Sequence, residues 1–152
     1  MATVGELMTR DVTTVPPDAT VHEMLRIWDQ RHFGAFPVVA DGRLVGIVTE
    51  GDLLYKESPI RPPVVLALLD ALIPIGGGRK LDEDVRKHAG YRAKDLMSAP
   101  VLTVGPDEDA ARAARIMVDR KIKHLPVVDA RGTLLGILSR RDLLHHLVQT
   151  LA

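Results

Sequence analysis

The chain has 152 residues, enough for one compact domain or two small interlocked units, and 46% of them are hydrophobic, which is sufficient for a buried core. Its 20 Lys and Arg balance its 20 Asp and Glu, which argues against a protein that binds nucleic acid by neutralising phosphates. The absence of cysteine excludes disulfides, thiolate nucleophiles and cysteine metal ligands. The start of the chain lacks the pattern of a signal peptide, and the most apolar window, 64–75, is too short for a membrane span. We therefore expect a cytoplasmic protein without a membrane or nucleic-acid partner.

The first predicted elements are a strand over Val12–Val15 and a helix that begins after Thr20. Thr20 and Glu23 have the spacing of a capping box, which favours a helix start there. Apolar residues then recur at helical spacing, at Val21, Met24, Leu25 and Trp28. Two short apolar runs, at 36–39 and 44–48, follow with a turn between them, and this pattern predicts a β-hairpin.

A long insertion, about Tyr55–Lys94, comes next. Its apolar part, Val64–Ile73, follows two prolines and is predicted to form a helix. Its charged part, Leu81–His88, is predicted to form an amphipathic helix closed by Gly90. We expect a helical connector that covers the sheets or joins a second subunit, and a lid over a ligand is the alternative.

The second half repeats the first. The segment Leu125–Asp142 has the same order of apolar run, turn, apolar run, hydroxyl and carboxylate as the segment Phe36–Asp52, with one extra residue in its turn. A second strand is predicted at Val101–Val104, before a helix with the smaller apolar residues Ala110, Ala113, Ala114 and Met117. Two copies of one unit are expected to pack face to face, because neither half buries its apolar face alone.

The main candidates for binding are Thr49-x-x-Asp52 and Ser139-x-x-Asp142, each placed where a strand leads into a helix. A helix N-terminus favours a phosphate, and a carboxylate can accept hydrogen bonds from a ribose diol. A hydroxyl residue followed three residues later by an acid also resembles a capping box, which needs no ligand. Both interpretations stay open at this point.

Two further features accompany these motifs. Gly46 and Gly136 lie inside the predicted strands, where glycine marks either the close approach of a ligand or packing between the repeats. The second copy is also rich in cations, which either lie on a solvated helix end or supply charge for a phosphate. These cations are Arg120, Lys121, Lys123, His124, Arg140 and Arg141, whereas the first copy has Arg31, His32, Gly34, Ala35, Glu50 and Gly51 at the matching positions.

Signs of catalysis are weak. The adjacent His145 and His146 point in different directions on a helix, so they do not form a metal site together. The glycine-rich run 76–80 lacks the spacing of a phosphate-binding loop. No serine lies in a nucleophile elbow. We therefore expect a protein that is not an enzyme and has no metal site.

The doubled pattern V-x-T-V-x-P-D, L/F-P-V-V and G-x-L-x-G-I-x-T/S-x-x-D-L-L resembles the cystathionine-β-synthase (CBS) domain pair, also called a Bateman module. The resemblance implies an α/β fold of two β-α-β-β-α repeats packed sheet to sheet with pseudo-twofold symmetry, plus a helical insertion. The implied boundaries are 1–56 for the first repeat, 57–94 for the insertion and 95–152 for the second repeat.

The resemblance also implies two clefts that hold AMP, ADP, ATP or S-adenosylmethionine as a regulatory ligand, with no other cofactor. By position, Asp52 and Asp142 hold ribose hydroxyls, and Ile47 and Ile137 line the adenine slot. The residues implied to lie near phosphate or ribose are Thr49, Ser139, Lys123, His124 and Arg141. The expected function is a regulatory module that signals to a protein target and forms a homodimer, and the alternative is a ligand-free scaffold for dimerisation or docking.

Overall fold

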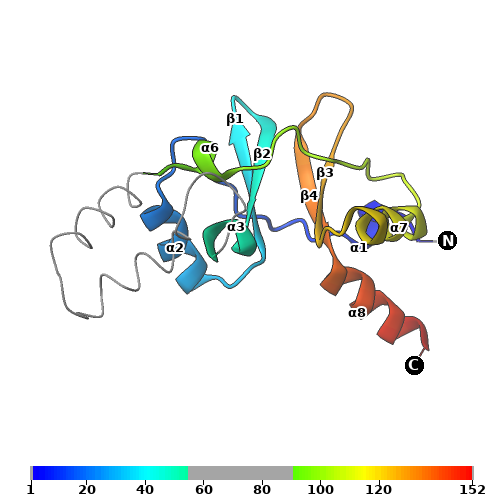
Figure 1. The fold of residues 1–152 in the computed structure, drawn as a ribbon. Coiled ribbons are helices and arrows are strands. Elements are labelled where there is room, and N and C mark those ends of the chain that lie inside the picture. Colours follow the sequence, from blue (N-terminus) through cyan, green and yellow to red (C-terminus); the bar gives the residue numbers. More distant parts are fainter. Residues whose placement is uncertain (1, 55–90, 152) are drawn as a thin grey trace, which may run out of the picture. The chain divides into compact units, whose positions relative to one another are not determined.

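The computed structural model of the protein describes residues 2–54 and 91–151 (Figure 1). The chain divides into two compact units. One, here the second-repeat unit, comprises Met1–Thr14, Val39–Val45 and Pro100–Ala152. The other, the first-repeat unit, comprises Val15–Val38 and Gly46–Ala99. Each unit therefore combines residues from both halves of the chain. The expected helices at 64–73 and 81–88 lie outside the described residues.

The first repeat contributes α2 (Val21–Gln30), β1 (Ala35–Ala40), β2 (Arg43–Thr49) and α3 (Glu50–Leu54). The predicted capping box of α2 is confirmed, because the Glu23 N–H donates to the Thr20 hydroxyl oxygen and the Thr20 N–H donates to the Glu23 carboxylate. The predicted hairpin is also confirmed, since β1 and β2 pair as a two-stranded sheet. Asp41 and Gly42 make the turn with φ of 52° and 77°, as a tight hairpin turn requires.

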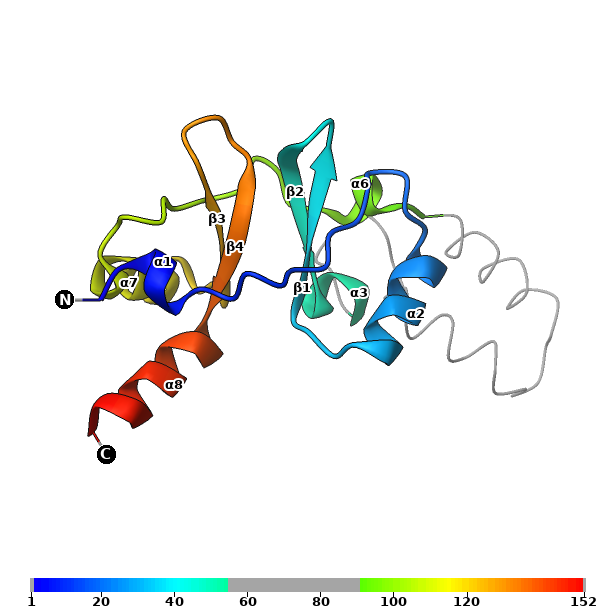
Figure 2. The ribbon, with the colours of Figure 1, turned by 180° about the vertical axis from the view of Figure 1, so that it is seen from behind.

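The second repeat contributes α7 (Ala110–Arg120), β3 (His124–Val128), β4 (Leu134–Ser139) and α8 (Arg140–Leu151), seen from behind in Figure 2. β3 and β4 are antiparallel, with Leu125 opposite Leu138, and their register shifts between Val127 and Val128. The second predicted hairpin and the helix after it are thus confirmed. The helix α8 has no buried residue.

The two strands predicted at Val12–Val15 and Val101–Val104 are wrong for most of their length. Only Val15 and Val104 form bridges, parallel to Val38 and Val127. The N–H of Val15 donates to the Pro37 carbonyl at 3.1 Å, and the N–H of Val104 donates to the Pro126 carbonyl at 3.1 Å. The next bond of a parallel ladder would need an N–H from the proline, which has none, so neither ladder extends toward the N-terminus.

Each repeat is completed by a short helix from the segment ahead of the other repeat. The helix α1 (Val4–Leu7) lies beside α7, where the Val4 N–H donates to the Glu108 carbonyl over 2.8 Å (Figure 1). The helix α6 (Ala93–Leu96) lies on the first repeat, where the Ala93 N–H donates to the Ala19 carbonyl over 2.8 Å. The two contacts are equivalent in the two repeats. The donors Val4 and Ala93 are 93 − 4 = 89 residues apart, and the acceptors Ala19 and Glu108 are 108 − 19 = 89 residues apart.

The second-repeat unit has an aliphatic core to which α1 contributes directly. Val4, Leu125, Val127 and Leu138 are completely buried in it. The core also contains the thioether of Met8, which lies just after α1. Among the described residues, no helix is long and apolar enough to cross a membrane.

Candidate functional site

The second strand–helix junction holds the carboxylate of Asp142 in a defined orientation. Its Oδ2 accepts the backbone N–H of Ser139 at 2.9 Å and the Ser139 hydroxyl at 3.0 Å. The Asp142 N–H donates to the Ser139 hydroxyl oxygen at 3.1 Å, which completes a capping box at the start of α8. The predicted capping interaction is therefore present, and the half-buried carboxylate still has a second oxygen.

That second oxygen has a partner that the sequence interpretation missed. The hydroxyl of Thr9 donates to Asp142 Oδ1 at 3.0 Å. Thr9 is brought there by β-type pairing with Ile137, in which each N–H donates to the other's carbonyl at 2.9 Å. Ser98 pairs with Ile47 in the same way in the first-repeat unit. The available signal was that both Thr9 and Ser98 directly follow a Leu-Met pair.

Cations gather at the same junction. The N–H of Arg140 donates to the Lys123 carbonyl at 3.0 Å, which places the residue before β3 next to the start of α8. Lys123, Arg140 and Arg141 are all exposed, and His124 is the first residue of β3. The junction therefore combines an oriented carboxylate with three permanent positive charges.

The first junction has the same backbone arrangement and different charges. Asp52 Oδ2 accepts the Thr49 N–H at 2.8 Å and the Thr49 hydroxyl at 3.1 Å. The Glu50 N–H donates to the Gly34 carbonyl at 3.1 Å. The Glu50 carboxylate in turn accepts the indole N–H of Trp28 at 3.1 Å.

The two strand glycines are explained by packing. A Cβ on Gly136 would lie 2.7 Å from the Thr9 carbonyl oxygen and 2.8 Å from the Met8 sulfur. A Cβ on Gly46 would lie 2.8 Å from Cγ of Met97. Both distances are shorter than real Cβ contacts allow. The segments ahead of the two repeats that make these contacts, 8–9 and 97–98, are here called the leading segments, and they need glycine at positions 136 and 46. Packing is therefore observed at both glycines, and Gly136 also lines a pocket.

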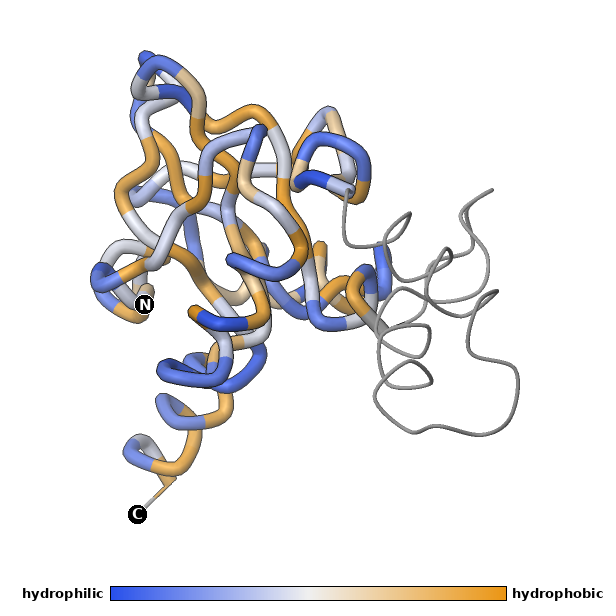
Figure 3. The backbone as a smooth tube through the Cα atoms, turned by 90° about the vertical axis from the view of Figure 1, so that its left-hand side faces the viewer, coloured by the Kyte–Doolittle hydropathy of each residue, from blue (hydrophilic) through white to orange (hydrophobic). Residues whose placement is uncertain are grey.

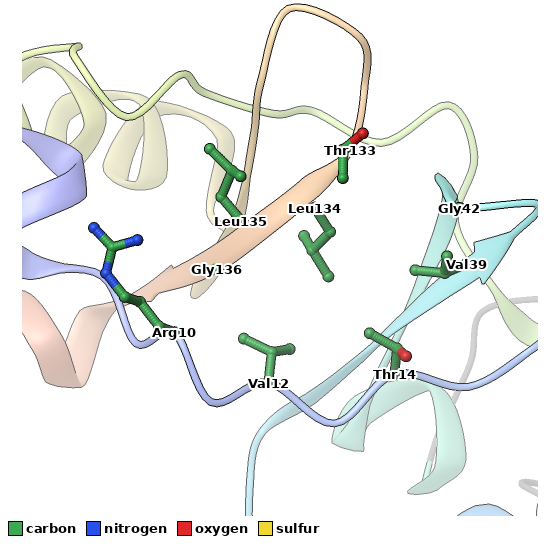
Figure 4. A pocket seen from close by; sticks show the side chains of 9 residues that line it. All are labelled: Arg10, Val12, Thr14, Val39, Gly42, Thr133, Leu134, Leu135 and Gly136. Carbon is green, nitrogen blue, oxygen red and sulfur yellow. The ribbon is translucent and has the colours of Figure 1, made fainter.

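A pocket of about 200 Å³ lies in the second-repeat unit (Figure 4). Val12, Val39 and Leu134 point toward the same space, and Leu135 and Arg10 also line it. The pocket is close in sequence to the Asp142 junction. Arg10, which follows Thr9, and Gly136, which precedes Ile137, both line it. It therefore offers an apolar wall beside a cation and close in sequence to the oriented carboxylate.

The structure thus brings the predicted residues into two clusters. Ile137, Ser139, Arg141, Asp142, Lys123 and His124 belong to the second-repeat unit, and Ile47, Thr49 and Asp52 belong to the first. The two isoleucines are each 9% exposed. In the part of the chain that the structure describes, no group of three or more His, Asp or Glu could hold a metal ion.

Comparison with known proteins identifies the family. The CBS domain model matches residues 4–58 and 93–149. A protein from Methanopyrus kandleri, MK0525, is 32% identical over 93% of this chain, and the chloroplastic CBS domain-containing protein CBSX1 of Arabidopsis thaliana is 32% identical over 97%. The chain spans 60% and 64% of the lengths of these two curated relatives.

Solved structures agree with this match. The crystal structure of CBSX2 of Arabidopsis thaliana in complex with AMP is similar over 100% of both chains, with a TM-score of 0.75 and 28% identity. The expected CBS-pair fold of two repeats with mixed helices and strands is therefore confirmed. The chain belongs to the CBS domain family and carries two CBS repeats.

Proposed function

We propose that this chain is a regulatory module that binds an adenosine derivative and passes a change of shape to a partner protein. The observation that carries the proposal is the likeness to CBSX2, whose crystal structure contains AMP. The oriented carboxylates of Asp52 and Asp142 support it, because such groups accept hydrogen bonds from a ribose diol. No catalytic step is part of the proposal.

The Asp142 junction suggests how the ligand binds. The ribose hydroxyls replace the Thr9 hydroxyl at Oδ1, while the capping bonds to Oδ2 keep the carboxylate in place. The phosphate lies among Lys123, Arg140 and Arg141 at the N-terminus of the twelve-residue helix α8, where the helix dipole also favours an anion. The base enters the pocket that Val12 and Leu134 line.

Regulation then follows from differential affinity. A ligand that holds Asp142 and the cations of α8 favours whichever arrangement of the chain closes around it. Thr9 and Asp142 come from opposite ends of the chain and lie in the same unit, so a ligand that displaces the hydroxyl of Thr9 changes how the segment around Thr9 is held on that unit. A partner that recognises one arrangement would detect the bound ligand.

The test is calorimetric titration of AMP into the wild-type chain and into Asp142→Ala. Each hydrogen bond to a charged group contributes about 1.5–3 kcal/mol, so we expect AMP affinity to fall at least tenfold. The free energy of unfolding should fall by about 1 kcal/mol, the usual contribution of a helix cap. The reverse pattern, with stability lost and affinity kept, would leave Asp142 with a capping role alone.

A second candidate function is a scaffold that dimerises or docks a partner without a ligand. It is favoured by α8, where an apolar stripe is exposed: Leu144 is 61%, Leu147 51%, Val148 68% and Leu151 85% exposed. Figure 3 shows hydrophobic and hydrophilic stretches alternating along this helix. We propose that a second copy of the chain covers the stripe. Saturable heat release with AMP would favour the sensor, and its absence with AMP, ATP and S-adenosylmethionine would favour the scaffold.

A further inference from the structure

We propose that the two strand–helix junctions select adenosine ligands of different charge. The second junction takes a phosphorylated adenosine, and the first takes an adenosine without phosphate, whose 5′ substituent is neutral or positively charged. The inference rests on the proposed function, because it divides the ligands of that function between two sites.

The comparison between the junctions depends on equivalent hydrogen bonds. The N–H of Arg140 donates to the Lys123 carbonyl at 3.0 Å, and the N–H of Glu50 donates to the Gly34 carbonyl at 3.1 Å. Glu50 therefore occupies the place of Arg140, and Gly34 the place of Lys123. The capping bonds are also matched, since each hydroxyl residue donates its N–H and its hydroxyl to Oδ2 of the aspartate.

The charges at these equivalent places have opposite sign. At the second junction, the matched positions carry three cations, Lys123, Arg140 and Arg141, and with Asp142 the formal sum is +2. At the first junction the equivalent residues are Gly34, Glu50 and Gly51, and with Asp52 the formal sum is −2. A phosphate group is attracted to the first of these arrangements and repelled by the second.

The negative charge of Glu50 is also fixed in position. An exposed glutamate ordinarily moves through several rotamers, but the Glu50 Oε1 accepts the indole N–H of Trp28 at 3.1 Å. Trp28 is in turn stacked on His32, with ring centroids 4.7 Å apart. The carboxylate is therefore held at the start of α3, where it opposes an anion and favours a cation.

The first turns of the two helices also differ in acidic residues. The first turn of α8 contains Asp142, whereas the first turn of α3 contains both Glu50 and Asp52. The two acidic side chains already compensate the partial positive charge at the start of α3. At the matched positions Gly34, Glu50 and Gly51, the first junction therefore offers a phosphate no cationic side chain.

Calorimetric titrations with two probes test the division. AMP carries a phosphate, and S-adenosylmethionine carries a sulfonium in its place. We expect Asp142→Ala to weaken AMP about 10- to 100-fold and to leave S-adenosylmethionine unchanged, and Asp52→Ala to do the reverse. AMP affinity should fall as salt is raised, because its site depends on cations. Equal weakening of AMP by both variants would overturn the proposal.

A charge exchange provides the stronger test. Glu50→Arg should create a second AMP site, which raises the measured stoichiometry from one AMP per chain to two, and should weaken S-adenosylmethionine at least tenfold. Asp29→Arg is the matched control, since it makes the same change of charge at an exposed position on α2. The proposal fails if the stoichiometry of Glu50→Arg stays at one, or if Asp29→Arg has the same effect.

Failure of the two proposals gives different results. If the wild-type chain binds neither AMP nor S-adenosylmethionine, the proposed function is wrong, and this inference is wrong with it. If the chain binds both probes but each displaces the other from one site, the proposed function stands and the division by charge is overturned.

Discussion

Gly136 shows how closely single residues of the leading segment approach β4. The backbone of Thr9 and the sulfur of Met8 occupy the space that a Cβ at this position would need. This contact matters for the proposed site, because the pairing of Thr9 with Ile137 is what presents the Thr9 hydroxyl to Asp142. One missing side chain therefore permits the pairing that brings the Thr9 hydroxyl to Asp142 Oδ1.

Gly136→Ala is expected to lower the free energy of unfolding by about 1–3 kcal/mol, because the added methyl group forces the leading segment away from β4. Gly51→Ala is the control, since its Cβ would lie 3.7 Å from the nearest atom and alanine favours a helix. Urea denaturation measures both variants. If the two substitutions have equal effects, close approach at Gly136 is not the reason for its glycine.

Asp129 is expected to make stability depend on pH. Backbone N–H groups of Thr133 and Arg131 donate to its carboxylate and lower its pKa below the usual range. A lowered folded-state pKa means that the charged form contributes stability above the unfolded pKa of about 3.9, and that this contribution disappears as the pH falls through the folded value.

The prediction is that Asp129→Asn unfolds at a lower temperature than the wild type near neutral pH and that the difference shrinks below about pH 4. Thermal unfolding across this pH range measures it. Asp119→Asn, at an exposed position of α7, controls for the loss of one charge. A difference that stays constant with pH would contradict the role given to the two N–H donors.

Among the elements, α8 belongs to both proposed surfaces. Its first turn contains Arg140, Arg141 and Asp142 of the proposed ligand site, and its later turns carry the exposed apolar stripe. The proposed ligand site and the proposed surface for a second copy therefore lie on one rigid helix. A ligand that shifts the start of α8 would also move the surface at its end.

Leu147→Glu should convert the proposed dimer to a monomer, because it places a charge within the stripe at a side chain that is 51% exposed. Gln149→Glu adds the same charge to α8 outside the stripe and should leave the dimer intact. Light scattering coupled to gel filtration distinguishes the two masses. A wild-type chain that is already monomeric at micromolar concentration would contradict the proposed dimer.

The predictable elements were those fixed by local sequence. The two hairpins, the capping box at Thr20 and the Ser139–Asp142 capping bonds each depend on residues only a few positions apart, so the sequence pattern contained them. Contacts between distant segments were not predictable in this way. The bond from Thr9 to Asp142 and that from Trp28 to Glu50 each join residues that no local pattern links. The two predicted strands failed for a reason of the same kind, because Pro37 and Pro126, which lack an N–H, lie in the distant strands that Val15 and Val104 pair with.

At the scale of the whole molecule, neither compact unit is formed by one half of the chain. Val4 is completely buried among second-repeat residues such as Leu125, although it precedes the entire first repeat in sequence. The chain passes from one unit to the other after residues 14, 38, 45 and 99. Each unit is therefore built from segments that alternate along the chain with segments of the other unit.

Val4→Ala should therefore unfold the chain as one cooperative unit, with a loss of about 2 kcal/mol for the buried methyl groups. Trp28, the single tryptophan, lies in the other unit and reports on it by fluorescence. The denaturation midpoint measured by Trp28 fluorescence should shift together with the midpoint measured by circular dichroism. Val118→Ala, at a side chain that is 75% exposed, is the control. An unshifted fluorescence midpoint would show that the units unfold separately.

The placement of α1 also has a consequence for the nascent chain on the ribosome. The backbone N–H of Val4 donates to the carbonyl of Glu108, which is synthesised 108 − 4 = 104 residues later. The carbonyl of Ala19 likewise accepts the N–H of Ala93, which is synthesised after it. At a synthesis rate of about 5–20 residues per second, the earliest segment stays without its partner for at least about 5 s. During that interval an apolar, unfinished N-terminal half is exposed to chaperones and proteases, and only the late arrival of the second half protects it.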